Sequence, residues 1–190
     1  MARNNSSGSK PDRTATRFFR ISGRALDSIE EEAKRRNVSV SIIINQQLLA
    51  HADFERYFRR LGLIKISLAT FQRLLKAGSD DHVARAGKEA GMDSARSVIL
   101  AKYGSLSLDT AIDYLRMLSE YANLFEIGQV DSGGRQIVSL LHNLGPKGSL
   151  FFRNYVNALF QSIEFDPKIT YTEHSIVIEI VLQDSRTSSF

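Results

Sequence analysis

The second half of the chain repeats one order of elements, a helix followed by a hairpin, and this repeat limits the folds open to it. The repeat consists of a helix over 108–124, a hairpin over 125–142 turning at 131–134, a helix over 148–163, and a hairpin over 168–182 turning at His174-Ser175. Two such units most simply form one four-stranded antiparallel sheet with both helices on one face. The sequence therefore predicts an α+β domain over residues 105–184, followed by a tail at 185–190.

Alternation in the last hairpin predicts which sheet face packs on the helices. The expected core-facing residues are Ile169, Tyr171, Ile176, Ile178, Ile180 and Leu182. Val177 and Val181 fall on the opposite face and leave it partly apolar. A partly apolar outer face indicates a partner.

The N-terminal part starts with a strand pattern that has no neighbour with which to pair. Residues 16–21 alternate, with Phe19 and Ile21 on one face, and helix-patterned sequence follows at once. A lone strand leaves N–H and C=O groups unpaired along both edges. The simplest partner is the same strand of a second copy, antiparallel across a two-fold axis. The pattern therefore predicts an intertwined homodimer.

Two amphipathic helices follow the strand. The first should end near Asn37, a residue that tolerates a left-handed C-cap, and Ser39 can N-cap the second. The helices supply apolar residues to the same core as the strand. The predicted dimer core consists of Phe19, Ile21, Leu26, Ile29, Ile44 and Leu48.

Residues Thr16 to about Phe54 resemble the ribbon-helix-helix family of DNA-binding repressors, chiefly in the turn Asn37-Val38-Ser39-Val40-Ser41. The resemblance assigns residues 16–55 to a DNA-binding domain whose two-stranded ribbon enters the major groove. It implies base contacts from Thr16, Phe18 and Arg20, and phosphate contacts from Arg13, Arg17, Ser39, Val40 and Ser41. The C-terminal half resembles segments of uncharacterised archaeal proteins that also begin with a ribbon-helix-helix. This resemblance implies a regulatory or oligomerisation role, with an unidentified effector or protein as the partner of the C-terminal domain.

Two registers of the ribbon are compatible with the sequence. Phe18 stands where the family has a polar residue, and Arg17 stands where it has an apolar core residue. A slip of one residue would turn Arg17 and Phe19 outward and Phe18 inward. The expected register buries Phe19 and Ile21, and the slipped one is the alternative.

Charge is concentrated at the start of the chain. Residues 1–24 carry six basic residues and one acid, so their net charge is +5. The net charge of the whole chain is +4, which leaves about −1 for residues 25–190. A basic, Ser/Asn/Gly-rich arm over residues 1–15 suits contact with phosphates. Residues 56–104 are expected to form a helical connector that includes a break at Gly91.

Several chemistries are disfavoured by the residue content. The chain has no cysteine, and its four histidines lack metal-ligand spacing, so neither a metal nor a cofactor is predicted. No nucleophile or nucleotide-binding motif appears, and we expect no catalytic residues. Segment 145–149 either holds an anion or turns the chain, with Ser149 as the N-cap of the next helix. Without an apolar run long enough for a bilayer or a secretory h-region, a cytoplasmic protein with no membrane partner is expected.

These features together predict a homodimeric, sequence-specific transcriptional regulator that binds double-stranded DNA through its ribbon. One alternative is an antitoxin or partition protein of the same N-terminal type. The other is a protein-interaction adaptor that dimerises through the ribbon and binds a protein at the C-terminal sheet.

Overall fold

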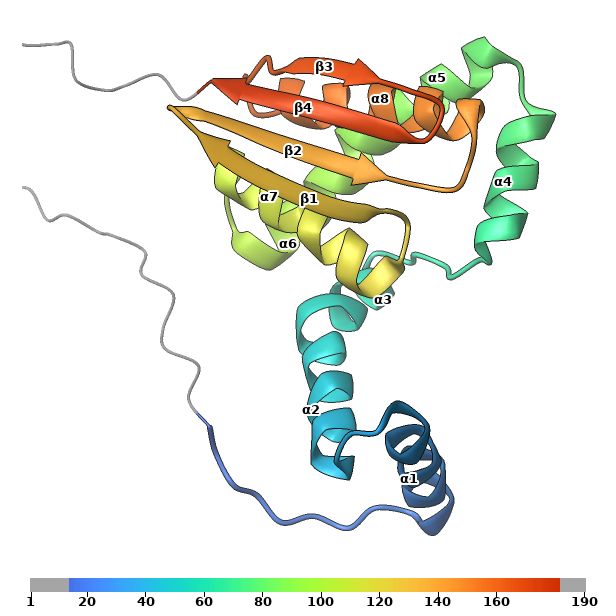
Figure 1. Cartoon of the computed structure of the whole chain (residues 1–190), viewed down its shortest axis with the longest axis vertical. Coiled ribbons are helices and arrows are strands. Elements are labelled where there is room, and N and C mark those ends of the chain that lie inside the picture. The colour runs from blue at the N-terminus through green and yellow to red at the C-terminus, as the bar shows by residue number, and fades with distance from the viewer. Residues whose placement is uncertain (1–13, 182–190) are drawn as a thin grey trace, which may run out of the picture. The chain divides into compact units, whose positions relative to one another are not determined.

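The computed structural model describes residues 14–181 of the chain, which has an α+β fold (Figure 1). The chain divides into two compact units, with the boundary between Gln47 and Leu48. Arg13 and Leu182, and most of the predicted arm at 1–15 together with the tail at 185–190, lie outside the described residues. No helix in the described part is long and apolar enough to cross a bilayer.

The N-terminal unit contains helix α1 (Gly23–Arg36) and the start of α2 (Val40–Ala50). Ser22 caps α1 by accepting a hydrogen bond from the N–H of Ala25. Asn37 adopts the left-handed conformation, with φ 52° and ψ 45°, and closes the last turn of α1. The predicted end of the first helix is thus confirmed, since Asn tolerates this conformation better than most residues.

The second unit contains the remaining helices and all four described strands. In chain order these are α3 (Arg56–Arg60), α4 (Leu68–Ala77), α5 (Asp80–Glu89), α6 (Arg96–Tyr103), α7 (Leu108–Met117), β1 (Glu126–Ser132), β2 (Arg135–Leu141), α8 (Pro146–Gln161), β3 (Lys168–Tyr171) and β4 (Ser175–Val181). Three π-helical turns at His51–Glu55, Ala90–Ala95 and Leu118–Ala122 continue α2, α5 and α7. The expected break at Gly91 is therefore wrong, because the backbone stays helical there.

The strands form one antiparallel sheet in the order β1-β2-β4-β3. This confirms the predicted four-stranded antiparallel sheet. Gly133 and Gly134, with φ 56° and 78°, form the two-residue turn of the first hairpin, which requires positive φ at both positions. In Figure 1 the sheet lies over α8, with α5, α6 and α7 on the same side.

The core lies between the sheet and α8. Ile176, Ile178 and Ile180 of β4 are fully buried, as predicted, and pack in one cluster with Phe152 and Leu159 of α8. Tyr171 differs from the prediction because it is half exposed on the short edge strand β3. The alternation of apolar residues therefore predicts the buried face of β4 correctly, but it does not predict the exposure of a residue at the end of an edge strand.

The opposite face of the sheet keeps apolar side chains in contact with solvent. Val130, Ile137, Leu141 and Val181 are all exposed on this face. Glu179 lies among them and forms ion pairs with Arg135 and Lys168, at 3.1 and 3.6 Å. The predicted, partly apolar outer face is therefore present, with charged groups at one end of it.

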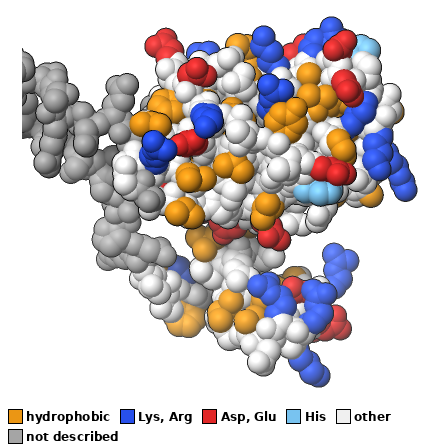
Figure 2. Space-filling view, turned by 45° about the horizontal axis from the view of Figure 1, so that its top comes forward, with side chains coloured by type: hydrophobic (Ala, Val, Ile, Leu, Met, Phe, Trp, Pro, Cys, Tyr) orange, Lys and Arg blue, Asp and Glu red, His pale blue; other side chains and the backbone are white. Residues whose placement is uncertain are grey.

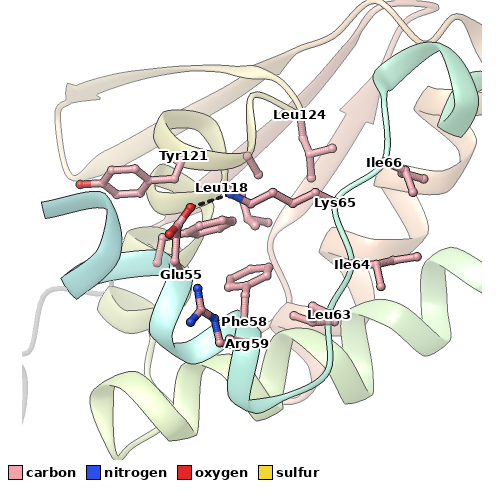
Figure 3. Close-up of a pocket in the computed structure, with 12 residues that line it drawn as sticks. Glu55, Phe58, Arg59, Leu63, Ile64, Lys65, Ile66, Leu118, Tyr121 and Leu124 are labelled. Carbon is pink, nitrogen blue, oxygen red and sulfur yellow. Dashed lines mark hydrogen bonds and ion pairs between the residues drawn. The ribbon is translucent and has the colours of Figure 1, made fainter. Parts of the chain in front are cut away.

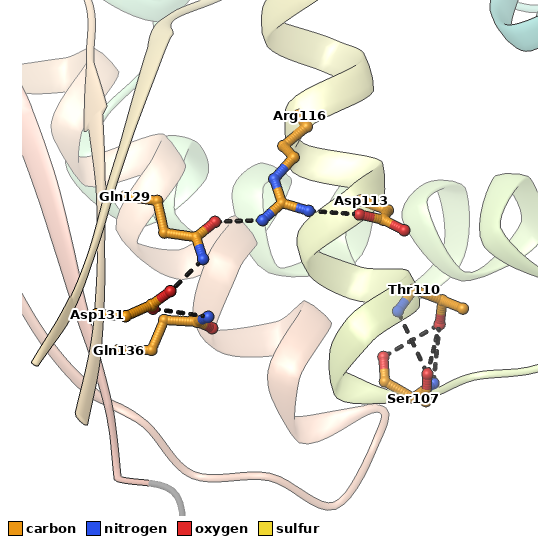
Figure 4. Close-up of polar contacts among 7 residues, drawn as sticks. All are labelled: Ser107, Thr110, Asp113, Arg116, Gln129, Asp131 and Gln136. Carbon is orange, nitrogen blue, oxygen red and sulfur yellow. Dashed lines mark hydrogen bonds and ion pairs between the residues drawn. The ribbon is translucent and has the colours of Figure 1, made fainter. Parts of the chain in front are cut away.

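Helix α7 is joined to the sheet by a chain of polar contacts (Figure 4). Arg116 pairs with Asp113, at 2.6 Å, and also donates a hydrogen bond to the side chain of Gln129 on β1. The amides of Gln129 and Gln136 both donate to Asp131, at 3.4 and 3.1 Å. These contacts join α7 to β1 and to the start of β2.

Residues 56–104 belong to the same compact unit as the sheet, rather than forming a separate connector. Two glycines allow α5 and its π-helical continuation to lie against α8. A Cβ atom on Gly87 would stand 2.3 Å from the carbonyl oxygen of Phe151, and one on Gly91 would stand 2.1 Å from that of Tyr155. Because both distances are far below van der Waals contact, the close approach depends on glycine.

Candidate nucleic-acid interface and an apolar cavity

The segment predicted as a DNA-reading strand carries no regular secondary structure in the single chain. Residues 14–20 are all exposed, so Thr16, Phe18 and Arg20 are accessible. Among residues 14–181, no hydrogen bond or ion pair joins this segment to the turn at 37–41. A strand is defined by its pairing, and a ribbon built from two copies cannot form in one, so the strand stays a prediction.

The turn between the helices has the geometry expected for an anion-binding helix start. Ser39 accepts a hydrogen bond from the N–H of Ile42 at its side-chain oxygen, at 3.4 Å, which confirms it as the N-cap of α2. The N–H groups of Val40 and Ser41 have no hydrogen-bond partner among the described residues. These groups point along the positive end of the helix dipole, where a phosphate oxygen would be stabilised.

The six residues of the predicted dimer core are not buried by one copy of the chain. Phe19 is 63% exposed and Leu48 is 58% exposed, whereas Ile21, Leu26, Ile29 and Ile44 are partly buried. Among residues 14–47, the buried side chains are those of Ala33 and Ile43. Two buried side chains are far too few to offset the entropy of ordering this unit.

Phe18 and Phe19 are both exposed in the single chain, at 97% and 63%. Their exposure does not distinguish the expected ribbon register from the slipped one, because neither face of the segment is covered. Arg17 donates a hydrogen bond to the carbonyl of Thr16 at 3.3 Å, which leaves its remaining N–H groups free for a phosphate or a base.

Basic residues near the turn are partly neutralised within α1. Glu32 pairs with Arg35 and, at 3.6 Å, with Arg36. Figure 2 shows basic, acidic and apolar side chains exposed together on the unit that carries α1. Arg17 and Arg20 before the helix, and Arg24 and Lys34 within it, form no ion pair among the described residues.

A separate feature, an apolar cavity, lies in the C-terminal unit (Figure 3). It has two adjoining chambers of about 460 and 420 Å³ that share six lining residues, namely Phe58, Leu63, Ile66, Leu118, Ala122 and Leu124. Leu63 points toward Phe58 in Figure 3, whereas the largely exposed Ile64 points away from it. The segment 61–67 thus forms one wall of the cavity without filling it.

The two chambers differ in their polar groups. The outer chamber is lined by Arg59 and by the ion pair between Glu55 and Lys65, at 2.6 Å, which lowers the pKa of Glu55. The inner chamber is lined by Tyr114 and Tyr155, whose hydroxyl oxygens lie 2.6 Å apart and are both buried. Burial raises the pKa of Tyr114 to about 12, so its hydroxyl stays neutral.

Sequence reasoning did not identify the cavity. Tyr114 and Tyr155 occupy apolar faces of amphipathic helices, where they appear as ordinary core residues. The available signal was that a buried tyrosine hydroxyl needs a hydrogen-bond partner, which two core tyrosines on separate helices can provide for each other.

His142 and Ser149 form a buried polar pair beside the sheet. The N–H of Leu144 donates to Nδ1 of His142 at 3.3 Å, so the ring proton lies on Nε2, which donates to the Ser149 hydroxyl at 3.0 Å. A catalytic base would instead accept the serine proton at that nitrogen. Ser149 is therefore a structural partner of His142, and the N-cap of α8 is Gly145 rather than Ser149 as expected.

We expect the stability of the C-terminal unit to fall on acidification because of His142. Burial, with a smaller effect of His174, holds the pKa of His142 below its usual value near 6.5. The unfolded chain therefore binds the proton first, so this stabilisation is complete above about pH 6.5 and is lost as pH falls toward the folded pKa. Urea unfolding at about pH 7 and about pH 5 measures the loss.

The matched comparison uses one buried and one exposed histidine. The variant His142→Asn should lose this part of the pH dependence, whereas His82→Asn, at an exposed position, should keep it. An equal pH dependence in wild type and His142→Asn would contradict the assignment.

Within residues 14–181, no group of three or more His, Asp or Glu side chains is arranged to hold a metal ion. Comparisons with protein-family models, curated proteins and solved structures found no match.

Proposed function

We propose that the chain is a homodimeric, sequence-specific DNA-binding regulator that inserts a two-stranded ribbon, one strand from each copy, into the major groove. Thr16, Phe18 and Arg20 recognise bases, and Ser39, Val40 and Ser41 hold a phosphate at the start of α2. The C-terminal unit then serves as a regulatory or oligomerisation domain.

The observation that carries the proposal is the unfilled apolar core of the predicted DNA-binding segment, residues 16–55. Its helices are correctly capped at Asn37 and Ser39, yet Phe19 and Leu48 remain more than half exposed. Pairing the segment 16–21 of two copies satisfies its unpaired backbone groups and covers these side chains in the same step. The free N–H groups of Val40 and Ser41, and the basic residues before α1, suit an anionic partner.

Selection from a pool of random duplex DNA at two salt concentrations tests the proposal. We expect an enriched motif with two-fold symmetry, and an affinity that falls as salt rises because phosphate contacts release counterions. Retention without a motif would overturn sequence-specific recognition. No retention at low salt would overturn DNA binding and favour the adaptor alternative.

Arg20→Ala should weaken binding to the selected site by about 1–3 kcal/mol in each half-site and relax base preference there, because a bidentate contact to guanine is lost. Arg85→Ala is the matched control, since it makes the same charge change at an exposed position on α5. Equal losses in the two variants would show that Arg20 contributes charge alone.

Arg17→Ala distinguishes the two ribbon registers. In the expected register Arg17 contacts phosphate, so its loss should weaken binding to all sequences alike and lower the salt dependence. In the slipped register Arg17 faces the bases, and its loss should relax the preference at one position of the motif.

A further inference from the structure

We propose that the apolar cavity of the C-terminal unit binds a small molecule with an apolar body and one neutral hydrogen-bond acceptor such as a carbonyl oxygen. This inference does not rest on DNA binding. It assigns a ligand site to residues of α3, the segment 61–67, α4, α7 and α8.

The dimensions and lining of the cavity fit a compact organic ligand. Each chamber is above the lower limit of about 300 Å³ for small-molecule sites. The shared wall consists of Phe58, Leu63, Ile66, Leu118, Ala122 and Leu124, all of which are apolar. Ligand binding would cover Leu63 and Ile66, which the chain alone leaves 38% and 46% exposed.

The tyrosine pair specifies the acceptor. Tyr114 and Tyr155 are 3% and 6% exposed, and the hydrogen bond between their hydroxyls uses one of their two protons. Each hydroxyl oxygen has the other as its partner, and the second proton enters no further hydrogen bond among residues 14–181, so it is available to an acceptor. Because both residues line the inner chamber, an acceptor on the ligand would satisfy this donor. Burial also raises the pKa of both hydroxyls, which keeps them protonated.

The outer chamber accounts for the orientation of the ligand. Its polar groups, Glu55, Lys65 and Arg59, are at least partly exposed, and Glu55 and Lys65 already pair with each other. The chamber lined by Tyr114 and Tyr155 therefore offers the hydrogen bond to the ligand, and the other chamber accommodates the apolar remainder between Phe58 and Leu118.

A matched pair of probes tests the site in the full-length protein. Propiophenone and propylbenzene have nearly the same shape and differ in one carbonyl group. We expect the carbonyl probe to bind about tenfold more tightly by calorimetry or NMR titration, because it alone accepts the tyrosine proton. Equal affinities, or binding of neither probe, would overturn the proposal.

Three variants locate the binding. The double variant Tyr114→Phe/Tyr155→Phe removes both hydroxyls and should bind the two probes equally, whereas either single variant leaves one donor. Ala122→Trp fills the shared wall and should abolish binding, whereas Ala101→Trp at an exposed position of α6 should not. Undiminished carbonyl preference in the double variant would overturn the role of the pair, even if Ala122→Trp did not fold.

Discussion

Replacing Gly87 or Gly91 by Ala is expected to destabilise the C-terminal unit by about 3 kcal/mol, although alanine normally stabilises a helix relative to glycine by about 1 kcal/mol. The added methyl group would lie 2.3 Å from the carbonyl oxygen of Phe151 in one case and 2.1 Å from that of Tyr155 in the other. The contacted atoms are backbone atoms of α8, which cannot move aside as the end of a flexible side chain would. Helix α5 must therefore shift away from α8, and the packing between them is lost.

Urea unfolding followed by far-UV circular dichroism measures this effect. Gly78→Ala is the matched control in the same unit, since a Cβ atom there would stand 3.4 Å from Val83, in ordinary contact, and φ is negative. The control should change stability by less than about 1 kcal/mol. If Gly87→Ala instead raised the free energy of unfolding, as alanine does in an uncrowded helix, α5 would not lie against α8 as described.

The fold of the C-terminal unit was predictable where the determinants were local. Gly133 and Gly134 between two alternating segments specify a hairpin, and the alternation of Ile176, Ile178 and Ile180 specifies its buried face. The same holds for Asn37 and Ser39, whose capping depends on their own conformations and on backbone groups a few residues away.

The remaining features depend on contacts distant in sequence. Gly87 and Gly91 look like weak points of a helix until α8 is placed beside them, which is why residues 56–104 were expected to form a connector. The cavity likewise depends on Tyr114 and Tyr155, which lie on two helices brought together by the sheet. Hydrophobic periodicity indicates that a face is buried, but not which element buries it.

The ribbon could not be tested in one copy for a different reason, because the strand expected to pair with residues 16–21 belongs to a second copy of the chain. If residues 16–21 form a strand, their backbone N–H and C=O groups need a partner strand. Within residues 14–181 of one copy, no backbone segment pairs with them. The proposed dimer therefore has to be tested through the residues expected to lie between the two copies.

Leu48→Asp should weaken the dimer by at least about 100-fold, because association would bury a carboxylate without a partner, at a cost of about 3–5 kcal/mol. Leu48 is 58% exposed in the single chain, so the substitution removes little packing within one copy, and its main effect should fall on association. Gln46→Asp makes a closely similar charge change at an exposed position two residues earlier on α2, about 200° around the helix. It should therefore leave the dimer unchanged.

Sedimentation equilibrium measures the dimer directly, and binding to the selected DNA site measures its consequence. If the ribbon is formed by two copies, Leu48→Asp should lose both the dimer and specific DNA binding, while the C-terminal unit, which has its own core, should unfold in urea as it does in the wild type. Loss of DNA binding with an intact dimer would place Leu48 at the DNA rather than in the core. A Leu48→Asp dimer as tight as the wild type would contradict the proposed dimer core, because Leu48 is one of the side chains that this core is expected to bury.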